Sequence, residues 1–520
     1  MGQKASGNRR FLCILRKAAD MKHTFKGQSD SVQKSLLEQL QEKGIFIPAD
    51  CGGIGRCGKC RVQFLSGAPE ASDDDQEIFD QAQLDAGWRL ACKAFPEGEY
   101  EIAWEQAEDE MEVATDFAAG ADDAGADARV DDGGIEASDP VIAIDIGTTT
   151  LAASLVDRAS GKVLDTKTSV NHQRSFGADV IARIQASVNG MRDELQDSIK
   201  KDLTGLVSNL GQDFSSVPVI ISGNTTMEHL LLGLPCDTLG VAPYTPVDIS
   251  LHQEDNMLIL PGISTYVGAD IVSGIIACGM DQSEEVSLLI DLGTNGEMAI
   301  GNKDRILVAS TAAGPAFEGG NISCGVAGIP GAVSSVTVEK DGDDVSVSYQ
   351  TIGNKPPVGL CGTGVMEVTY ELVKTEIVDE TGMMDEDYED DGFPIAENVT
   401  FSDQDVREVQ LAKSAIRAGA ETLMEEFGVE YAGVAHLYIA GGFGQKINLE
   451  KAAGIGMLPE ELLDRTKAVG NSSLAGAVMI AKDDALRERF AHVADYADEV
   501  SLTGNPTFND LYMEYMMFGE

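Results

Sequence analysis

The segment VIAIDIGTTT, residues 141–150, decides the fold of most of this chain. It reads as an apolar strand that ends in Asp-x-Gly-Thr and is followed by a polar turn and a second apolar stretch. The segment SLLIDLGTNG, residues 287–296, repeats the pattern. Because one pattern occurs twice among β-branched, glycine-rich segments and alternating helices, the sequence predicts two similar lobes of α/β architecture.

The Asp-x-Gly-Thr turn offers the groups that a bound phosphate needs. Its glycine lets the backbone approach the phosphate, its Thr hydroxyl and N–H groups donate to phosphate oxygens, and its Asp can hold Mg²⁺ directly or through water. A third segment, LYIAGGFG at residues 437–444, is an apolar strand with a glycine pair, which suits a flat purine and its ribose. Each motif alone could be an ordinary glycine turn, whereas the three together favour a nucleotide site.

In this order the three motifs resemble phosphate 1, phosphate 2 and adenosine of the actin, Hsp70 and sugar-kinase superfamily of ATPases. The resemblance implies a two-lobed α/β ATPase fold that binds ATP and Mg²⁺. It also implies that Asp145 and Asp291 are the catalytic carboxylates that face Mg²⁺. The nucleotide-lining residues that it implies are Gly147, Thr148, Thr149, Gly293, Thr294, Asn295, Gly296, Gly441 and Gly442.

A cysteine motif precedes the ATPase motifs. Cys51, Cys57 and Cys60 lie on one glycine-rich loop, and Cys92 follows about thirty residues later. Soft thiolates hold iron and sulfide, and the loop glycines let the backbone wrap closely and offer N–H groups to the sulfurs. The spacing is the plant-type layout for a [2Fe–2S] cluster, with one extra residue in the first gap. Zinc is the alternative, but zinc sites more often contain two C-x2-C pairs and this motif has one.

The sequence around these cysteines, PADCGGIGRCGKC at residues 48–60 and WRLAC at residues 88–92, resembles the ferredoxin superfamily over about the first hundred residues. Short strands are expected at 11–15, 61–65 and 100–104. A helix is expected at 31–43, with Ser29 or Asp30 as its N-cap and Gly44 as its stop. One helix among short strands suits an α+β fold of the β-grasp kind.

The predicted organisation has four parts. They are a ferredoxin-like domain (8–104), a flexible acidic linker (105–139), ATPase lobe I (140–285) and ATPase lobe II with the adenosine motif (286–520). The linker contains thirteen acidic residues and one Arg, so it cannot bury enough apolar surface to order itself. A helix is expected at 413–426 and a surface loop at 379–391. The glycine turns at 222–227 and 359–365 could line the nucleotide site or could be simple packing turns.

The formal net charge of −48 makes nucleic acid an unfavourable partner, because phosphate backbones repel such a surface. No apolar run is long enough to span a bilayer, which predicts a cytoplasmic protein without membrane insertion. The other cysteines are scattered and are expected to be small buried hydrophobes. They are Cys13, Cys236, Cys278, Cys324 and Cys361.

A [2Fe–2S] head and an ATPase of this superfamily on one chain resemble the reductive activators of corrinoid proteins, the RACo family. The segments that carry the likeness are 141–150, 222–227, 266–270, 291–296, 314–319, 407–413 and 439–443. The resemblance implies an ATP-dependent enzyme that passes one electron from the cluster to Co(II) and restores Co(I) for methyl transfer, for example in O-demethylase systems. It implies a corrinoid protein and an upstream low-potential electron donor as partners, and a homodimer as the assembly.

Three other functions remain open at this point. One is another ATP-driven electron donor, although activators of 2-hydroxyacyl-CoA dehydratases use a cluster that bridges two subunits. A second is a small-molecule kinase with a redox-sensing cluster, for which Asp270 is the candidate base. A third is a plain electron carrier with a vestigial ATPase fold, which the retention of both Asp145 and Asp291 disfavours.

Overall fold

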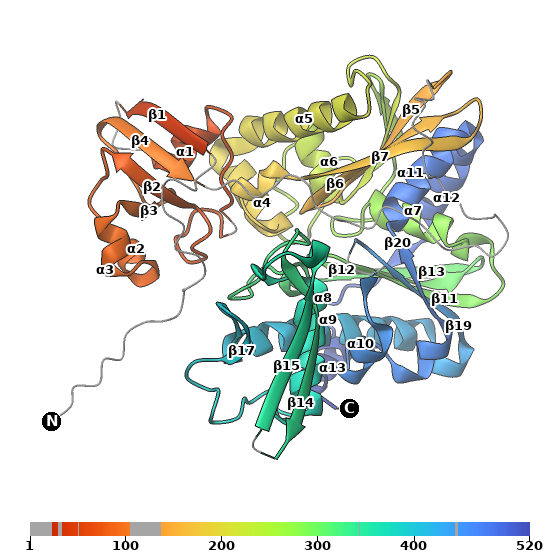
Figure 1. Ribbon diagram of the computed structural model, residues 1–520. Helices are drawn as coiled ribbons and strands as arrows, with labels where there is room; N and C mark the ends of the chain where they lie inside the picture. The colour runs from red at the N-terminus through yellow and green to blue at the C-terminus, as the bar shows by residue number, and fades with distance from the viewer. Residues whose placement is uncertain are drawn as a thin grey trace.

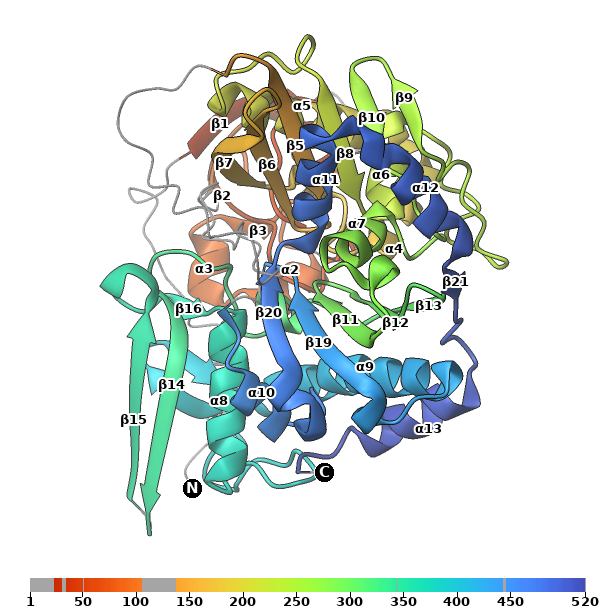
Figure 2. The same ribbon diagram turned by 90° about the vertical axis from the view of Figure 1, so that its right-hand side faces the viewer.

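The computed structural model describes residues 23–29, 34–49, 51–104, 137–342, 344–442 and 446–519. The strand expected at 11–15 and the acidic segment from 105 to 136 lie outside the described residues. Figure 1 shows the N-terminal head beside a larger two-lobed body, and Figure 2 shows the same arrangement from the side.

The head is a four-stranded sheet with the strand order β1-β4-β2-β3 and three short helices. Its elements are β1 (His23–Ser29), α1 (Leu36–Gln41), β2 (Arg61–Ser66), α2 (Asp73–Ile78), α3 (Gln81–Asp85), β3 (Trp88–Leu90) and β4 (Gly98–Trp104). The strands expected at 61–65 and 100–104 are therefore confirmed. The first described strand, β1, was not expected from the sequence, and it pairs antiparallel with β4 over its whole length.

The first helix of the head begins later than the sequence predicted. Its N-cap is Ser35, not Ser29 or Asp30, and α1 runs only to Gln41. The Ser35 side chain accepts a hydrogen bond from the Glu38 N–H, and the Glu38 carboxylate accepts one from the Ser35 N–H. This reciprocal capping box satisfies two backbone donors at once, which fixes the start of the helix there.

The body contains two six-stranded sheets, and five strands of each follow the same order. The first consists of β5 (Pro140–Ile146), β6 (Thr150–Asp157), β7 (Lys162–Val170), β8 (Val219–Gly223), β9 (His252–Glu254) and β10 (Met257–Ile259). The second consists of β11 (Val286–Leu292), β12 (Gly296–Asn302), β13 (Arg305–Thr311), β19 (Val434–Ala440), β20 (Thr466–Gly470) and β21 (Asp498–Glu499). The strand orders are β7-β6-β5-β8-β10-β9 and β20-β19-β11-β12-β13-β21.

In each sheet the strand before the Asp-x-Gly-Thr turn pairs antiparallel with the strand after it and parallel with a later strand. In the first sheet β5 pairs antiparallel with β6 and parallel with β8. In the second, β11 pairs antiparallel with β12 and parallel with β19. The repeated motif thus builds the same hairpin twice, which confirms the predicted two-lobed α/β fold.

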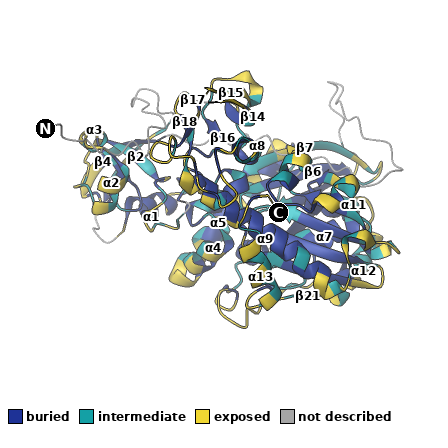
Figure 3. Ribbon diagram, turned by 90° about the horizontal axis from the view of Figure 1, so that it is seen from below, coloured by how far each residue is buried: buried dark blue, intermediate teal, exposed yellow. Residues whose placement is uncertain are grey.

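Helices cover both faces of the two sheets. They are α4 (Val180–Ala186), α5 (Arg192–Asn209), α6 (Thr225–Leu232), α7 (Ala269–Ala277), α8 (Gly362–Lys374), α9 (Asp403–Phe427), α10 (Leu449–Gly454), α11 (Ser472–Lys482), α12 (Arg487–Tyr496) and α13 (Pro506–Glu514). The helix expected at 413–426 is α9, which starts earlier because Ser402 and Asp405 form a capping box. In Figure 3, α7 and α9 are mostly buried, whereas α2 and α3 of the head are mostly exposed.

Two helices, α7 and α11, lie between the sheets and join the lobes. Although α11 comes from the C-terminal part of the chain, it packs on β5, β6 and β8 of the first sheet, and α7 packs on β11 and β12 of the second. One apolar core accordingly contains residues of both sheets. Glycines allow the close approach, since a Cβ added at Gly476 would lie 2.4 Å from the Ser273 Cβ.

Replacing Gly476 by Ala is therefore expected to destabilise the protein by about 1–3 kcal/mol, the usual cost of overpacking a core. The matched control is Gly205→Ala, at an exposed position of α5, where an added Cβ meets nothing within 4 Å. That change should stabilise by about 0.5–1 kcal/mol, because alanine favours a helix over glycine. Urea unfolding of both variants measures the difference, and equal effects would contradict the close crossing of α7 and α11.

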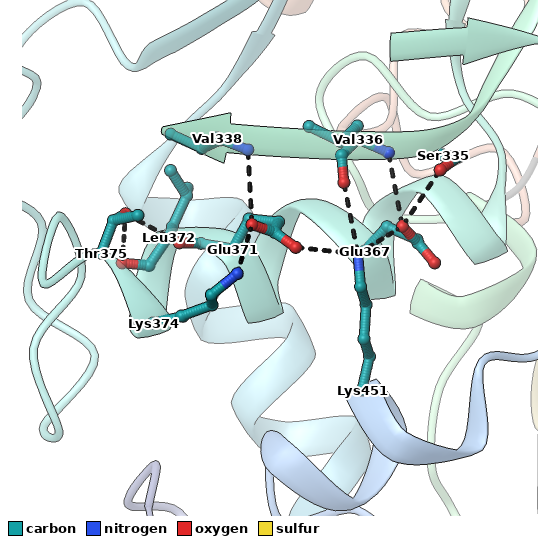
Figure 4. A network of polar contacts seen from close by, with 9 residues as sticks. All are labelled: Ser335, Val336, Val338, Glu367, Glu371, Leu372, Lys374, Thr375 and Lys451. Atoms are coloured by element: carbon teal, nitrogen blue, oxygen red, sulfur yellow. Dashed lines mark hydrogen bonds and ion pairs between the residues drawn. The ribbon is translucent and has the colours of Figure 1, made fainter. Parts of the chain in front are cut away.

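A smaller sheet extends the second lobe and is anchored by a buried ion-pair network (Figure 4). Its strands are β14 (Ala332–Asp341), β15 (Asp344–Thr351) and β16 (Gly359–Leu360), and a separate hairpin comprises β17 (Phe393–Ala396) and β18 (Val399–Phe401). The Lys451 Nζ of α10 lies 2.7 Å from Glu367 Oε2 and 2.9 Å from Glu371 Oε1, both on α8. The Glu371 carboxylate also accepts from the Val338 N–H of β14. These contacts fix α8, whose first residues reach the cavity between the lobes.

The acidic segment 379–391 consists of turns, as the sequence predicted. Among the described residues, none of the helices has both the length and the apolar character that crossing a bilayer requires.

Candidate functional site: an interlobe cavity and a thiol cluster

A cavity of about 980 Å³ lies between the two lobes. The predicted residues that line it are Asp145, Gly147, Thr148, Thr149, Asp291, Gly293, Thr294, Asn295, Gly441 and Gly442. Gly296 does not line it. This glycine starts β12, and a Cβ there would meet the Thr311 and Met298 side chains, so its role is packing behind the turn. The structure thus brings together all but one of the residues that the sequence assigned to the nucleotide.

A backbone hydrogen bond from the first glycine closes each phosphate turn, and the second turn is one residue shorter than the first. The Gly147 N–H donates to the Thr150 carbonyl at 3.0 Å, and the Gly293 N–H donates to the Asn295 carbonyl at 3.1 Å. A Cβ on Gly147 would lie 2.7 Å from the Thr150 oxygen, so this turn requires glycine. Residues of lobe I support the first turn from behind. Asn171 Nδ2 donates to the Gly147 carbonyl at 2.9 Å, and the buried Arg183 guanidinium donates to the Thr148 carbonyl at 2.6 Å.

The glycine pair after β19 brings the third motif against the second. Gly441 has a φ of +95°, and a Cβ there would lie 2.4 Å from the Leu292 carbonyl oxygen and 2.8 Å from Asp291 Oδ1. Its N–H donates to the Gly470 carbonyl. Glycine is needed at this position because any side chain would separate the adenosine motif from the second phosphate turn.

Carboxylates from both lobes meet in the cavity. Asp145 accepts hydrogen bonds from Ser473 Oγ and Asn471 Nδ2, both at 2.7 Å, from the start of α11. Burial raises the pKa of Asp145, although both hydrogen bonds oppose the rise. Burial together with neighbouring carboxylates raises the pKa of Asp291 to about 8, and burial raises that of Asp270 to about 7. Carboxylates gathered in one cavity are oxygen ligands of the kind that Mg²⁺ prefers.

Glu318, for which the sequence predicted no role, connects the two phosphate turns. Its Oε2 accepts hydrogen bonds from Thr149 Oγ1 at 2.9 Å and from Thr294 Oγ1 at 2.7 Å. Burial raises the pKa of this carboxyl. The only sequence signal for Glu318 was its place in the segment GPAFEG, residues 314–319, which carries the family likeness.

Other cavity residues also come from outside the three motifs. They are Arg174, Asn224, Asp270, Glu297, Lys446, Asn471 and Ser473 among the polar ones. The two glycine turns left open by the sequence both contribute. Asn224 lies on the first turn, and Cys361, Gly362 and Thr363 lie on the second. In the second turn Leu360 and Val365 are fully buried, so that turn serves packing as well.

The raised pKa values predict how stability depends on pH. The pKa of an unfolded Asp is about 4, whereas the pKa values of Asp270 and Asp291 in the folded protein are about 7 and 8. At a pH between these values, the folded state binds more protons than the unfolded state. In the absence of Mg²⁺, raising the pH from 6 to 8.5 is therefore expected to lower Tm. Because metal ligands must be ionised, adding Mg²⁺ at pH 8.5 should raise Tm again. Calorimetry with and without Mg²⁺ measures this, and a Tm insensitive to Mg²⁺ at pH 8.5 would contradict it.

The four motif cysteines of the head gather as two pairs. Cys60 Sγ and Cys92 Sγ lie 3.4 Å apart, and the Cys51 and Cys57 thiols are hydrogen-bonded to each other. Within the described residues, no three His, Cys, Asp or Glu side chains form a set that could hold one metal ion. Two pairs suit a [2Fe–2S] cluster, in which four cysteines serve two irons, better than one tetrahedral zinc.

The loop that carries three of these cysteines also supplies backbone donors. Hydrogen bonds from the Cys57 thiol and from the backbone N–H groups of Gly55 and Arg56 lower the pKa of Cys51. Gly52, Gly53, Gly55 and Gly58 all have positive φ, as a loop wrapped around a bound group requires. A thiolate held by N–H donors is the form that binds iron. The donor set therefore fits the cluster.

Known domain families match consecutive parts of the chain. The 2Fe-2S iron-sulfur cluster binding domain matches residues 23–97, the RACo middle region matches residues 141–283, and the C-terminal domain of RACo, the ASKHA domain, matches residues 285–520. The corrinoid activation enzyme RamQ of Eubacterium limosum is 30% identical over 427 residues, which cover 73% of this chain and 70% of RamQ. This chain belongs to the RACo family.

Two further proteins match this RACo family member over most of its length. The Co(II) methylated amine-specific corrinoid protein reductase of Methanosarcina barkeri is 24% identical over 72% of this chain and 76% of its own length. A solved structure, a reductive activator for a corrinoid, iron-sulfur protein, is 27% identical and covers 94% of this chain and 96% of its own, with a TM-score of 0.66. The resemblance inferred from the sequence is confirmed.

Proposed function

We propose that this chain restores Co(I) in a corrinoid protein by passing it one electron in a step that ATP drives. The observation that carries the proposal is the presence of a paired-thiol site and an interlobe phosphate cavity on one chain of the RACo family. The relatives are described as a corrinoid activation enzyme and a corrinoid protein reductase, which supports the same substrate class here.

Reduction by a plant-type cluster alone is uphill for this substrate. Such clusters have potentials near roughly −400 mV, and Co(I) demands a stronger reductant. Each tenfold change in the equilibrium constant of a one-electron step corresponds to about 59 mV. The protein must therefore couple the transfer to a second event, and ATP can drive it only if its binding or hydrolysis changes how tightly the corrinoid protein is held.

The residues of the cavity have defined parts in this proposal. The turns at Gly147 and Gly293 hold the phosphates, Gly441 and Gly442 the adenosine, and Asp145 and Asp291 face Mg²⁺. Since Thr149 and Thr294 belong to different lobes and both donate to Glu318, phosphates bound at these turns would act on both lobes at once. Cys51, Cys57, Cys60 and Cys92 would hold the cluster, which supplies the single low-potential electron when bound.

The test mixes anaerobically reduced protein with a Co(II) corrinoid protein of a methyltransferase system and follows the Co(I) absorbance. Formation of Co(I) is expected to require both ATP and Mg²⁺. Equal yields with and without ATP would refute the coupling, and no Co(I) under any condition would refute the substrate class. The upstream electron donor, a homodimeric assembly and the cytoplasmic location remain predictions.

A phosphotransferase is the second candidate, and one observation favours it. Asp270 lines the cavity, and burial raises its pKa to about 7, as a general base requires. Incubation with labelled ATP and a panel of small hydroxyl compounds would reveal a phosphorylated product. Water as the sole acceptor would leave reductive activation as the function.

A further inference from the structure

The head lies beside lobe I, next to α4 and α5 (Figure 1). Gln41 Nε2 of α1 donates to the Ser175 carbonyl at 2.7 Å, and this contact is buried. Lys201 Nζ of α5 donates to the Gly44 carbonyl at 2.9 Å. Both bonds join segments far apart in the sequence, and together they fix how the head lies on the ATPase body.

An aromatic contact completes this interface. The Phe46 ring of the head lies with its centroid 6.0 Å from that of His172 and 6.1 Å from that of Phe176. The Lys201 ammonium lies over the same ring at 5.3 Å. His172 belongs to the short helix His172–Ser175, which also contains the cavity-lining Arg174. The head thus docks on the segment that forms part of the cavity wall.

The cysteine loop itself touches this wall. A Cβ added at Gly52 would lie 3.5 Å from the Phe176 carbonyl oxygen and 3.9 Å from the Ala182 Cβ. The next residue, Arg183, donates to the Thr148 carbonyl in the first phosphate turn. The loop that carries Cys51 is therefore one layer of residues away from the turn that would hold a phosphate.

One side chain of the loop reaches further, into the cavity. Lys59, next to Cys60, lines it together with Pro48 of the head. Lys59 is exposed, and in the described parts of the chain no carboxylate forms an ion pair with it. The cavity carboxylates are Asp145, Asp270, Asp291, Glu297 and Glu318, and its basic side chains are Lys59, Arg174 and Lys446. A ligand that bears several negative charges would need these cations.

We propose that Lys59 is a phosphate-binding residue of the nucleotide site, supplied by the ferredoxin head across the domain interface. The inference rests on the nucleotide binding in the proposed function, but not on the corrinoid substrate. Because binding free energies are linked, a phosphate contact from the head would have a reciprocal effect on docking. If the docked head strengthens ATP binding by a given factor, bound ATP strengthens docking of the head by the same factor. ATP would then control where the cysteine cluster is held.

The test measures ATP·Mg²⁺ binding by calorimetry, with the full-length, cluster-loaded, oxidised protein and without any corrinoid protein. Lys59→Ala is expected to weaken binding roughly tenfold or more, since a charge-assisted hydrogen bond is lost. Lys59→Arg should keep most of the affinity, because it keeps the charge. The matched control is Lys26→Ala, which removes an exposed cation of β1 in the head that does not line the cavity. Its affinity should stay within about twofold of the wild type.

A double-mutant cycle separates docking from local charge. Lys201 holds the head but does not line the cavity, so Lys201→Ala should also weaken ATP binding by loosening the head. Once Lys59 is absent, the second change should cost little, because head docking then brings no phosphate ligand. Equal ATP affinity of Lys59→Ala and the wild type, or equal losses in Lys59→Ala and Lys26→Ala, would overturn the inference. Absence of ATP binding to the wild type would instead overturn the nucleotide part of the proposed function, and this inference with it.

Discussion

Replacing Cys92 by Ser is expected to abolish stable cluster binding, with iron and inorganic sulfide falling to a small fraction of their wild-type content. Cys92 is buried, and its sulfur lies 3.4 Å from that of Cys60, so the two form one of the two thiol pairs. The serine oxygen is a harder ligand than sulfur, and its hydroxyl is a much weaker acid than a thiol. Serine is therefore a poor replacement for a thiolate ligand of iron. Formation of Co(I) should be lost, whereas ATP binding should persist, because Cys92 does not line the cavity.

The matched control for this change is Cys236→Ser. Cys236 is also buried, but it lies in lobe I, where its thiol donates to the Leu234 carbonyl. A serine hydroxyl can make the same hydrogen bond, so iron content should not change. Iron and sulfide analysis with the visible absorbance spectrum measures both variants. A wild-type protein that contains zinc and no sulfide would contradict the [2Fe–2S] assignment.

Replacing Asp291 by Asn is expected to lower the rate of Mg²⁺-dependent ATP hydrolysis by about 100-fold or more, the usual scale for losing one preorganised electrostatic contact. Asn keeps the shape of the side chain but cannot supply the charge that faces Mg²⁺. The change should also stabilise the Mg²⁺-free protein at pH 8.5. Burial and the nearby carboxylates Asp270, Asp145 and Glu318 raise the pKa of Asp291 to about 8, so removing its charge relieves that repulsion. Opposite effects on activity and on stability are the signature of a functional carboxylate.

Asp304→Asn is the control for this second change. Asp304 is exposed on the loop between β12 and β13 of the same lobe, outside the cavity. It should leave both ATP turnover and the dependence of Tm on pH unchanged. Phosphate release and calorimetry across pH 6 to 8.5 measure the two quantities. Wild-type turnover in Asp291→Asn would place the Mg²⁺ carboxylate elsewhere, with Asp145 as the next candidate.

Local patterns predicted the elements that are built from contiguous residues. The repeated Asp-x-Gly-Thr turn specified two hairpins, β5–β6 and β11–β12, because strand alternation and a glycine turn are properties of neighbouring residues. The start of α1 was predicted wrongly, since several serines and aspartates near it can cap a helix. Ser35 caps the helix because Glu38, three residues later, completes the reciprocal hydrogen bonds.

By itself, the sequence determined which groups are available: four thiols at cluster spacing and three glycine turns of the kind that bind phosphate and adenosine, each contained in a short stretch. Only the tertiary structure decided how these parts are combined. It placed Glu318 between Thr149 and Thr294, moved Gly296 out of the cavity, and set Lys59 of the head on the cavity wall. The physical reason is that these contacts join residues far apart in the sequence, in some cases by more than a hundred positions. Their proximity depends on how the lobes and the head pack, and no local pattern encodes that packing.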